Sequence, residues 1–141
     1  MGSGTQGTVF TALRPRYPSV FAVKFHLREV AYYREVGVYR RLQELNINEV
    51  CGHEVPLLLN CNDELLAFEM TIVRPPFILD FGGAYLDRPP DYSEEVWDDW
   101  RVQKAEAFEE NWLAVEEILA TFRLFGIFIA DVNPGNIRFT H

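Results

Sequence analysis

One acidic residue, Glu35, lies at the centre of an otherwise apolar helix face, and this feature most constrains what the chain can fold into. The segment 28–45 has helical spacing of its apolar residues and contains no proline. At about 100° per residue, five apolar side chains lie on the same face as Glu35. They are Ala31, Tyr32, Val38, Tyr39 and Leu42. A carboxylate buried among such neighbours requires a cation, so the helix must pack against an element that supplies one.

Lys24 is the cation that we expect to pair with Glu35. It lies within the apolar run 20–25, and this run and the run 8–13 are rich in Val, Phe, Ala and Thr. Two prolines in the intervening turn favour two antiparallel strands with Lys24 on the second. A lysine facing solvent is the alternative. The other acid near the start of the helix, Glu29, points about 120° away from Glu35 and is the weaker partner.

The rest of the pattern predicts one α+β domain spanning residues 1–141. Two further strands are expected at 55–59 and 65–73, joined by a turn that is rich in Asn and Asp. A capping box at 91–94 then opens a region that looks helical as far as Phe125. With 48% hydrophobic residues the chain can bury one core. We expect a small sheet with one helix in residues 1–73 and a helical part in residues 74–141.

An aromatic stripe follows the predicted helical region at three- and four-residue steps. Its large members are Trp100, Phe108, Trp112 and Phe122. A short helical part offers little for this face to pack against, and an uncovered apolar face favours association. The sequence therefore predicts a homo-oligomer or a partner protein.

Composition excludes several classes of partner. The net charge of -8 leaves no surplus of positive charge for phosphate backbones, so we expect no nucleic-acid binding. No apolar run is long enough to span a membrane and the N-terminus lacks a signal-peptide pattern, so a cytoplasmic protein is expected. Cys51 and Cys61 are then expected to be reduced. Cys51 and His53 do not make a zinc site, because a second pair of ligands at suitable spacing is missing.

Two motifs point to phosphate chemistry. Residues 2–9 fit the pattern G-x-G-x-x-G-x-V, in which glycines let backbone N–H groups approach phosphate oxygens closely. A flexible chain start is the alternative interpretation of this segment. Asp131 and Asn136 stand five residues apart after an apolar helix that ends at Gly126. The glycine-rich turn, Lys24, Glu35 and this pair follow one another in the order typical of a kinase.

Residues 126–137 resemble the catalytic loop of the protein-kinase-like superfamily, and their Pro-Gly-Asn form is similar to that of compact prokaryotic small-molecule and lipopolysaccharide kinases. The resemblance implies a kinase-like fold, binding of ATP and Mg²⁺, and transfer of phosphate to an unknown small-molecule or protein acceptor. It implies that Asp131 handles the proton of the acceptor hydroxyl, that Asn136 holds magnesium, and that Lys24, paired with Glu35, contacts the ATP phosphates. The nucleotide-contacting residues that it implies are Gly2, Gly4, Gly7 and Val9 in the glycine loop and Glu69, Met70 and Thr71 in the hinge, with Phe68 guarding the back pocket.

Three departures from the family pattern stand beside this resemblance. Ile129 and Ala130 replace the residues usually found before the aspartate, and Asn133 replaces a basic residue. The metal-binding Asp-Phe-Gly expected after Asn136 does not follow before His141, so the domain is expected to be truncated and to lack its second metal ligand. The segment 80–82 spells Asp-Phe-Gly but precedes the catalytic loop, and we interpret it as a turn whose likeness arises by chance.

Three hypotheses remain open at this point. The first is an ATP-dependent phosphotransferase, in which Asp131 and Lys24 carry the chemistry. The second is an inactive, pseudokinase-like module that binds nucleotide or a protein. The third is an α+β interaction protein in which the ordered motifs arise by coincidence.

Overall fold

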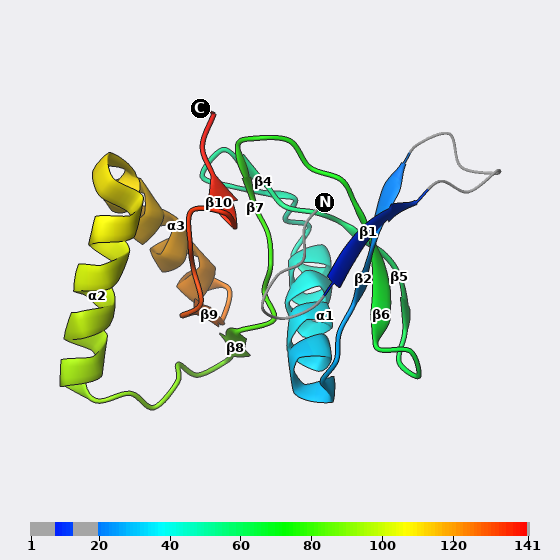
Figure 1. The fold of residues 1–141 in the computed structure, drawn as a ribbon, viewed down its shortest axis with the longest axis horizontal. Coiled ribbons are helices and arrows are strands. Elements are labelled where there is room, and N and C mark those ends of the chain that lie inside the picture. Colours follow the sequence, from blue (N-terminus) through cyan, green and yellow to red (C-terminus); the bar gives the residue numbers. More distant parts are fainter. Residues whose placement is uncertain (1–7, 13–19, 141) are drawn as a thin grey trace.

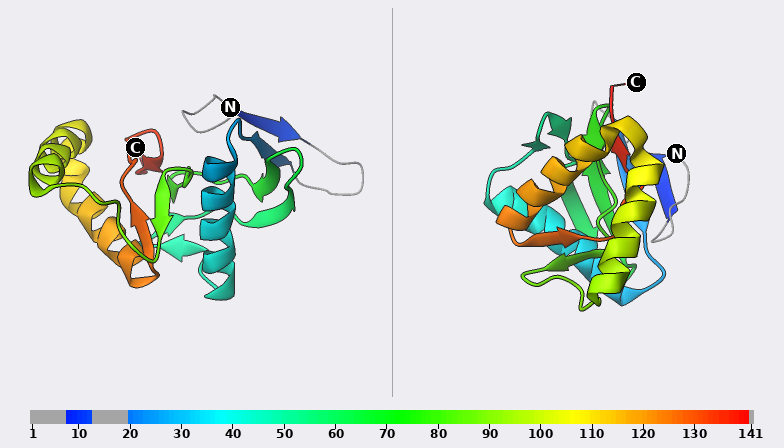
Figure 2. Two further views of the ribbon diagram at one scale, coloured as in Figure 1. Left: turned by 90° about the horizontal axis from the view of Figure 1, so that it is seen from below. Right: turned by 90° about the vertical axis from the view of Figure 1, so that its left-hand side faces the viewer.

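The computed structural model describes residues 8–12 and 20–140 and has an α+β architecture. A four-stranded sheet lies at one end of the molecule, and two helices, α2 and α3, lie at the other (Figure 1). Helix α1 and two smaller sheets lie between these ends, as the turned views also show (Figure 2). The mixed α+β class that the sequence predicts is therefore confirmed. Gly2, Gly4 and Gly7 lie outside the described residues.

The larger sheet is antiparallel throughout and has the order β1-β2-β6-β5. Its strands are β1 (Thr8–Ala12), β2 (Phe21–Phe25), β5 (Leu58–Asn62) and β6 (Ala67–Thr71). Strand β2 pairs on one side with β1 and on the other with β6, so Lys24 faces Val9 and Phe68 in the register. The first two predicted strands are confirmed. The strand expected at 55–59 begins three residues later, at Leu58.

Helix α1 (Glu29–Glu44) follows β2 almost directly and carries the predicted buried face. All five apolar neighbours of Glu35 are buried, and Val36 joins them. Figure 1 shows this helix lying alongside the larger sheet. The apolar face of α1 is therefore buried, as its spacing predicts. Its burial brings Glu35 to the side of the sheet that carries Lys24.

Two small sheets, which the sequence pattern does not predict, connect the halves of the molecule. One has the order β10-β7-β4-β3 and the other consists of β8 and β9. The strands are β3 (Glu49–Val50), β4 (His53–Glu54), β7 (Phe77–Ile78), β8 (Ala84–Leu86), β9 (Ile127–Ile129) and β10 (Ile137–Arg138). Each has only two or three residues, too few for an alternating pattern to be recognised in the sequence.

The helical region is interrupted, which corrects the prediction of continuous helix up to Phe125. Helix α2 (Glu94–Phe108) ends where Glu109 adopts a φ of 53°, and the 3₁₀ helix η1 (Glu109–Asn111) leads into α3 (Trp112–Leu124). The α2 cap is Ser93, whose Oγ accepts a hydrogen bond from Val96 N at 3.2 Å. Because the chain turns at Glu109, the aromatic stripe is split over two helices. No described helix is long and apolar enough to cross a membrane.

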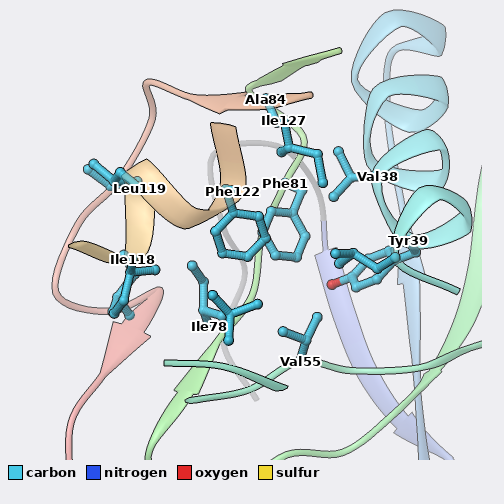
Figure 3. Packing of buried hydrophobic residues seen from close by; sticks show 14 of the residues in the cluster. Val38, Tyr39, Val55, Ile78, Phe81, Ala84, Ile118, Leu119, Phe122 and Ile127 are labelled. Atoms are coloured by element: carbon cyan, nitrogen blue, oxygen red, sulfur yellow. The ribbon is translucent and has the colours of Figure 1, made fainter. Parts of the chain in front are cut away.

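The core joins α1, α3 and the small sheets. Figure 3 shows the rings of Phe81 and Phe122 next to each other, and their centroids are 5.6 Å apart. Tyr39 of α1 packs edge-on against Phe81 at 5.3 Å. Phe81 is 1% exposed, so it anchors the segment between β7 and β8 to both sides of the molecule. This anchoring determines where the neighbouring Asp80 lies.

Candidate functional site

Lys24 lies at the centre of a buried ionic cluster. Its Nζ is 2.8 Å from Glu35 Oε1 and 3.1 Å from Asp80 Oδ1. Lys24 is 3% exposed and Glu35 is fully buried. The pairing expected from the helix face is therefore present, and the alternative of a solvent-facing lysine is wrong. A second carboxylate, from Asp80, joins the pair.

Glu35 is held by three different donors. Besides Lys24, His26 Nε2 lies 2.9 Å from Glu35 Oε1, and the Phe81 N–H donates to Oε2 at 2.8 Å. Burial alone would raise the pKa of Glu35, but the His26 hydrogen bond and the Lys24 charge outweigh it, and the net shift is downward. Glu35 is therefore an anion through which α1 is connected to β2 and to the segment between β7 and β8.

The charge on Lys24 is stabilised in the same way. Burial would lower the pKa of Lys24, whereas the carboxylates of Glu35 and Asp80 raise it, and the net shift is upward. Lys24 is therefore a fixed ammonium group in a poorly hydrated place.

Two strand–loop–strand segments run side by side and bring Asp80 to Asn136. Strand β10 pairs with β7 and β8 pairs with β9, both antiparallel. Ile137 lies opposite Ile78, and the Leu79 N–H donates to Asn136 O at 3.0 Å. Asn136 Nδ2 then donates to Asp80 Oδ2 at 3.3 Å. Asp80 thus contacts Lys24 through one carboxylate oxygen and Asn136 through the other.

The turn expected at residues 80–82 is present, with the Ala84 N–H donating to Phe81 O at 3.0 Å, and it places Asp80 beside Lys24 and Asn136. Asp80 has a φ of 71°, a left-handed conformation that Asp tolerates better than most residues. Backbone held in this region is costly and persists where the surroundings determine it. Here the buried Phe81 side chain and its N–H bond to Glu35 hold the turn. An acidic side chain from upstream in the chain thus lies beside Asn136.

Asp131 lies on the other side of the same turn. A Cβ added to Gly83 would come within 2.7 Å of Asp131 Cβ and 3.2 Å of Asp131 Oδ2, so the two loops approach closely at a glycine. Helix α2 holds the backbone on both sides of Asp131. Trp100 Nε1 donates to Ala130 O at 2.7 Å, and Lys104 Nζ donates to Val132 O at 2.6 Å.

The Asn133 side chain shapes the loop 131–136 by local hydrogen bonds. Its Oδ1 accepts a hydrogen bond from Gly135 N at 2.8 Å, and its carbonyl accepts one from Asn136 N at 3.0 Å. This is the Asx-turn geometry by which Asn closes a tight loop. Asn133 therefore serves the local structure of this loop.

The predicted nucleotide-contacting residues lie along the sheet. Val9 is half-buried opposite Lys24. Glu69, Met70 and Thr71 belong to β6, which lies between β2 and β5. The Thr71 N–H donates to Leu57 O at 3.0 Å. Residues 72–74 follow in neither a strand nor a helix. Phe68, expected to guard the back pocket, is 1% exposed and stacks on His26 with 6.1 Å between ring centroids.

Several residues of the site were missed from the sequence alone. His26 stands two positions after Lys24, and the two-residue period of a strand would have placed it on the same face. Asp80 begins an Asp-Phe-Gly sequence, but this sequence precedes residues 131–136 in the chain, so Asp80 was not expected in the site. The spacing of Trp100 and Lys104 placed them on one side of a helix, but it did not show that they hold the loop around Asp131.

No protein-family model matches this chain, and no curated protein matches it in sequence. Within residues 8–12 and 20–140, no group of three or more His, Cys, Asp or Glu side chains is arranged to hold a metal ion. Asp80 and Asn136, which share a hydrogen bond, are only two side chains and so do not form such a group. The site is therefore defined by its own geometry: a buried lysine, a carboxylate that it shares with an amide, and an aspartate on the adjoining loop.

Proposed function

We propose that this chain is an ATP-binding, protein-kinase-like phosphotransferase. The observation that carries the proposal is the position of the Asp80 carboxylate between Lys24 Nζ, at 3.1 Å, and Asn136 Nδ2, at 3.3 Å. Phosphoryl transfer from ATP requires a cation for the phosphates and oxygen ligands for magnesium close together. In this proposal Lys24, held by Glu35 at 2.8 Å, would be the cation, and Asp80 and Asn136 would offer the oxygen ligands.

The side chains present fit the chemistry of Mg²⁺ and nucleotide. Magnesium prefers oxygen ligands and is bound through one or two carboxylates together with substrate phosphates, so a three-residue protein cage is not required. Asp80 and Asn136 would hold the ion, and Lys24 would bind phosphate oxygens. When bound, magnesium neutralises charge that develops on the transferred phosphoryl group.

Asp131 would act on the acceptor. Its carboxylate accepts the proton of the acceptor hydroxyl while that oxygen forms a bond to the γ-phosphorus of ATP. The bond from the γ-phosphorus to the bridging oxygen breaks at the same time, which leaves ADP and a phosphorylated acceptor. The hydrogen bonds from Trp100 and Lys104 to the flanking carbonyls hold Asp131 in place for this step.

One observation favours a second candidate, an inactive nucleotide-binding module. Asn133 uses its side chain to close the loop, so this position supplies no positive charge to the transferred phosphoryl group. Removing a charge that stabilises the transition state lowers the rate without preventing nucleotide binding. In this alternative the Lys24 cluster binds nucleotide, and no acceptor is phosphorylated.

Thermal unfolding with and without Mg-ATP tests the shared part of both candidates. A ligand present at one hundred times its Kd adds about 2.7 kcal/mol of stability to the folded state. We expect a stabilising shift that requires magnesium and disappears in Lys24→Met. The matched control is Arg101→Met, which removes an exposed cation that pairs only with Asp98 among the described residues. No shift at millimolar nucleotide would refute nucleotide binding.

Transfer itself is tested with Asp131→Asn. In a phosphotransferase this variant retains the Mg-ATP shift but loses turnover by a factor of about 10²–10⁴, the usual contribution of a positioned base. Slow ATP hydrolysis, with water as acceptor, provides the readout before an acceptor is known. If the wild-type chain binds Mg-ATP and its hydrolysis rate equals that of Asp131→Asn, the inactive module is the correct function.

A further inference from the structure

A cavity of about 450 Å³ opens beside Asp131, on the side of the β8 turn that holds Gly82 and Gly83. Residues from α1, β8, the loop before α2, α2 itself and the catalytic loop line it. Six of them carry the inference, and they are Arg28, Arg34, Tyr85, Tyr92, Trp100 and Asp131. The volume lies within the range of sites for small molecules.

Two arginines give this cavity a positive side. The Arg34 guanidinium lies 4.3 Å from the centroid of the Tyr85 ring, which holds it in place by a cation–π contact. Arg28 immediately precedes α1 and is exposed. Among the described residues neither arginine forms an ion pair with a carboxylate, unlike Arg41 and Arg101. The chain as a whole carries a net charge of -8, so this pair is a local exception to its acidity.

Three aromatic side chains, Tyr85, Tyr92 and Trp100, also line the cavity. Trp100 donates its Nε1–H to Ala130 O, which uses its polar atom and leaves the ring to line the cavity. Tyr92 has its pKa raised by burial and by the neighbouring Tyr85, while Arg34 opposes and Asp131 adds to the shift. Arg34 and Asp131 line the same cavity as Tyr92, so positive and negative groups share it.

We propose that this cavity receives the acceptor, and that the acceptor is a small molecule with at least one hydroxyl group and one carboxylate or phosphate group. The inference rests on the phosphotransferase function proposed above. Arg34 and Arg28 bind the anionic group, because guanidinium groups match carboxylate and phosphate geometry. The aromatic rings cover the body of the molecule, and its hydroxyl group meets Asp131.

Isothermal titration calorimetry on the full chain tests this selectivity without requiring turnover. The probes are glucose 6-phosphate, gluconate and uncharged glucose, each titrated in the absence of nucleotide. We expect at least one of the two anionic probes to bind at least about tenfold more tightly than glucose, because a hydrogen bond to a charged group has this magnitude. Its affinity should fall as salt is added.

Arg34→Gln should remove the preference for the anionic probe. Arg40→Gln is the matched control, because Arg40 is an exposed residue of the same helix that does not line the cavity. Circular dichroism and the unfolding temperature of both variants establish that each is folded. The inference is overturned if glucose binds as tightly as both anionic probes, or if Arg34→Gln and Arg40→Gln bind them equally well.

The two proposals fail in different ways. If the chain shows no Mg-ATP shift but still selects the anionic probe through Arg34, the anion site stands and the phosphotransferase function does not. If the chain binds Mg-ATP but shows no preference among the probes, the anionic acceptor is refuted and nucleotide binding is unaffected.

Discussion

Asn136 donates a hydrogen bond to Asp80 across 56 positions of the chain, with 3.3 Å between Nδ2 and Oδ2. The two residues meet because β10 pairs with β7 while β8 pairs with β9, so the loops between these strands face each other. The other carboxylate oxygen of Asp80, Oδ1, lies 3.1 Å from Lys24 Nζ. Asp80 therefore connects the sheet that carries the lysine to the loop that carries Asp131.

Asp80→Asn tests this connection. The substitution keeps the size of the side chain but removes the charge that would bind magnesium and neutralise Lys24. We expect Mg-ATP to bind at least about tenfold more weakly, since a hydrogen bond or contact with a charged group is worth about 1.5–3 kcal/mol. Titration of magnesium against a fluorescent ATP analogue measures the change. Asp98→Asn, in an exposed ion pair on α2, is the control and should leave binding unaltered.

Glu35→Gln should destabilise the fold strongly. It leaves Lys24 and His26 without the buried carboxylate that both contact at 2.8 and 2.9 Å. Removing one partner of a buried ion pair costs about 3–5 kcal/mol, and Asp80 favours the lower end because it still pairs with Lys24. Urea unfolding gives the free energy of unfolding. Glu44→Gln, at the exposed end of the same helix, should change it by less than about 0.5 kcal/mol.

The double variant Lys24→Met with Glu35→Leu separates the role of the pair in stability from its role in binding. Replacing a buried ion pair by apolar residues is often neutral or stabilising. We expect the double variant to regain much of the stability lost in Glu35→Gln and to bind no Mg-ATP. A double variant that is less stable than Glu35→Gln would show that the partners lost by Asp80, His26 and the Phe81 N–H matter more than removal of the buried pair.

Stability should decline at both ends of the pH scale because of this cluster. The pKa of Glu35 is lowered from its usual 4.5, so its contribution is complete above pH 4.5 and is lost as the pH falls through the folded-state value. The pKa of Lys24 is raised from its usual 10.5, so its contribution is complete below pH 10.5 and is lost above it. Urea unfolding between pH 3 and pH 11 should give a plateau between these limits. In Glu35→Gln the acidic decline should be smaller than in the unaltered chain.

Gly83→Ala should separate the two loops of the site. Its Cβ would lie 2.7 Å from Asp131 Cβ, a contact that only a shift of the loop that carries Asp131 can relieve. We expect lower stability by about 1–3 kcal/mol and a loss of turnover. Gly37→Ala is the control, because its Cβ would meet only the flexible end of Leu86, at 2.9 Å, within a helix that favours Ala. Equal effects of the two substitutions would contradict the close approach at Gly83.

Trp100→Phe should loosen the loop that carries Asp131. The variant keeps an aromatic ring but loses the 2.7 Å hydrogen bond from Nε1 to Ala130 O, at a cost of about 1 kcal/mol. Hydrogen exchange of the amides in residues 130–136 should accelerate, while exchange in β2 and β6 should not change. Val102→Ala, at an exposed position of the same helix, should leave exchange in the loop unaltered.

Local sequence patterns predicted those features of the molecule that depend on a single helix or strand. The apolar face of α1 identified Glu35 as a buried carboxylate, and the apolar run of β2 identified Lys24 as its partner, because burial imposes a period on helices and strands. The break at Glu109 was not predicted, because apolar spacing continued through it. The cap at Ser93 was missed because several residues near it are also good caps.

The sequence by itself therefore determined the α+β class, the Lys24–Glu35 pair and the loop that carries Asp131 and Asn136. Only the tertiary structure decided that Asp80 joins them and that Arg34, Trp100 and Asp131 share a cavity. These relationships depend on strands of two or three residues whose partners lie far away in the chain. Such strands are stable only when the surrounding core, here Phe81 packed between Tyr39 and Phe122, holds both segments in register.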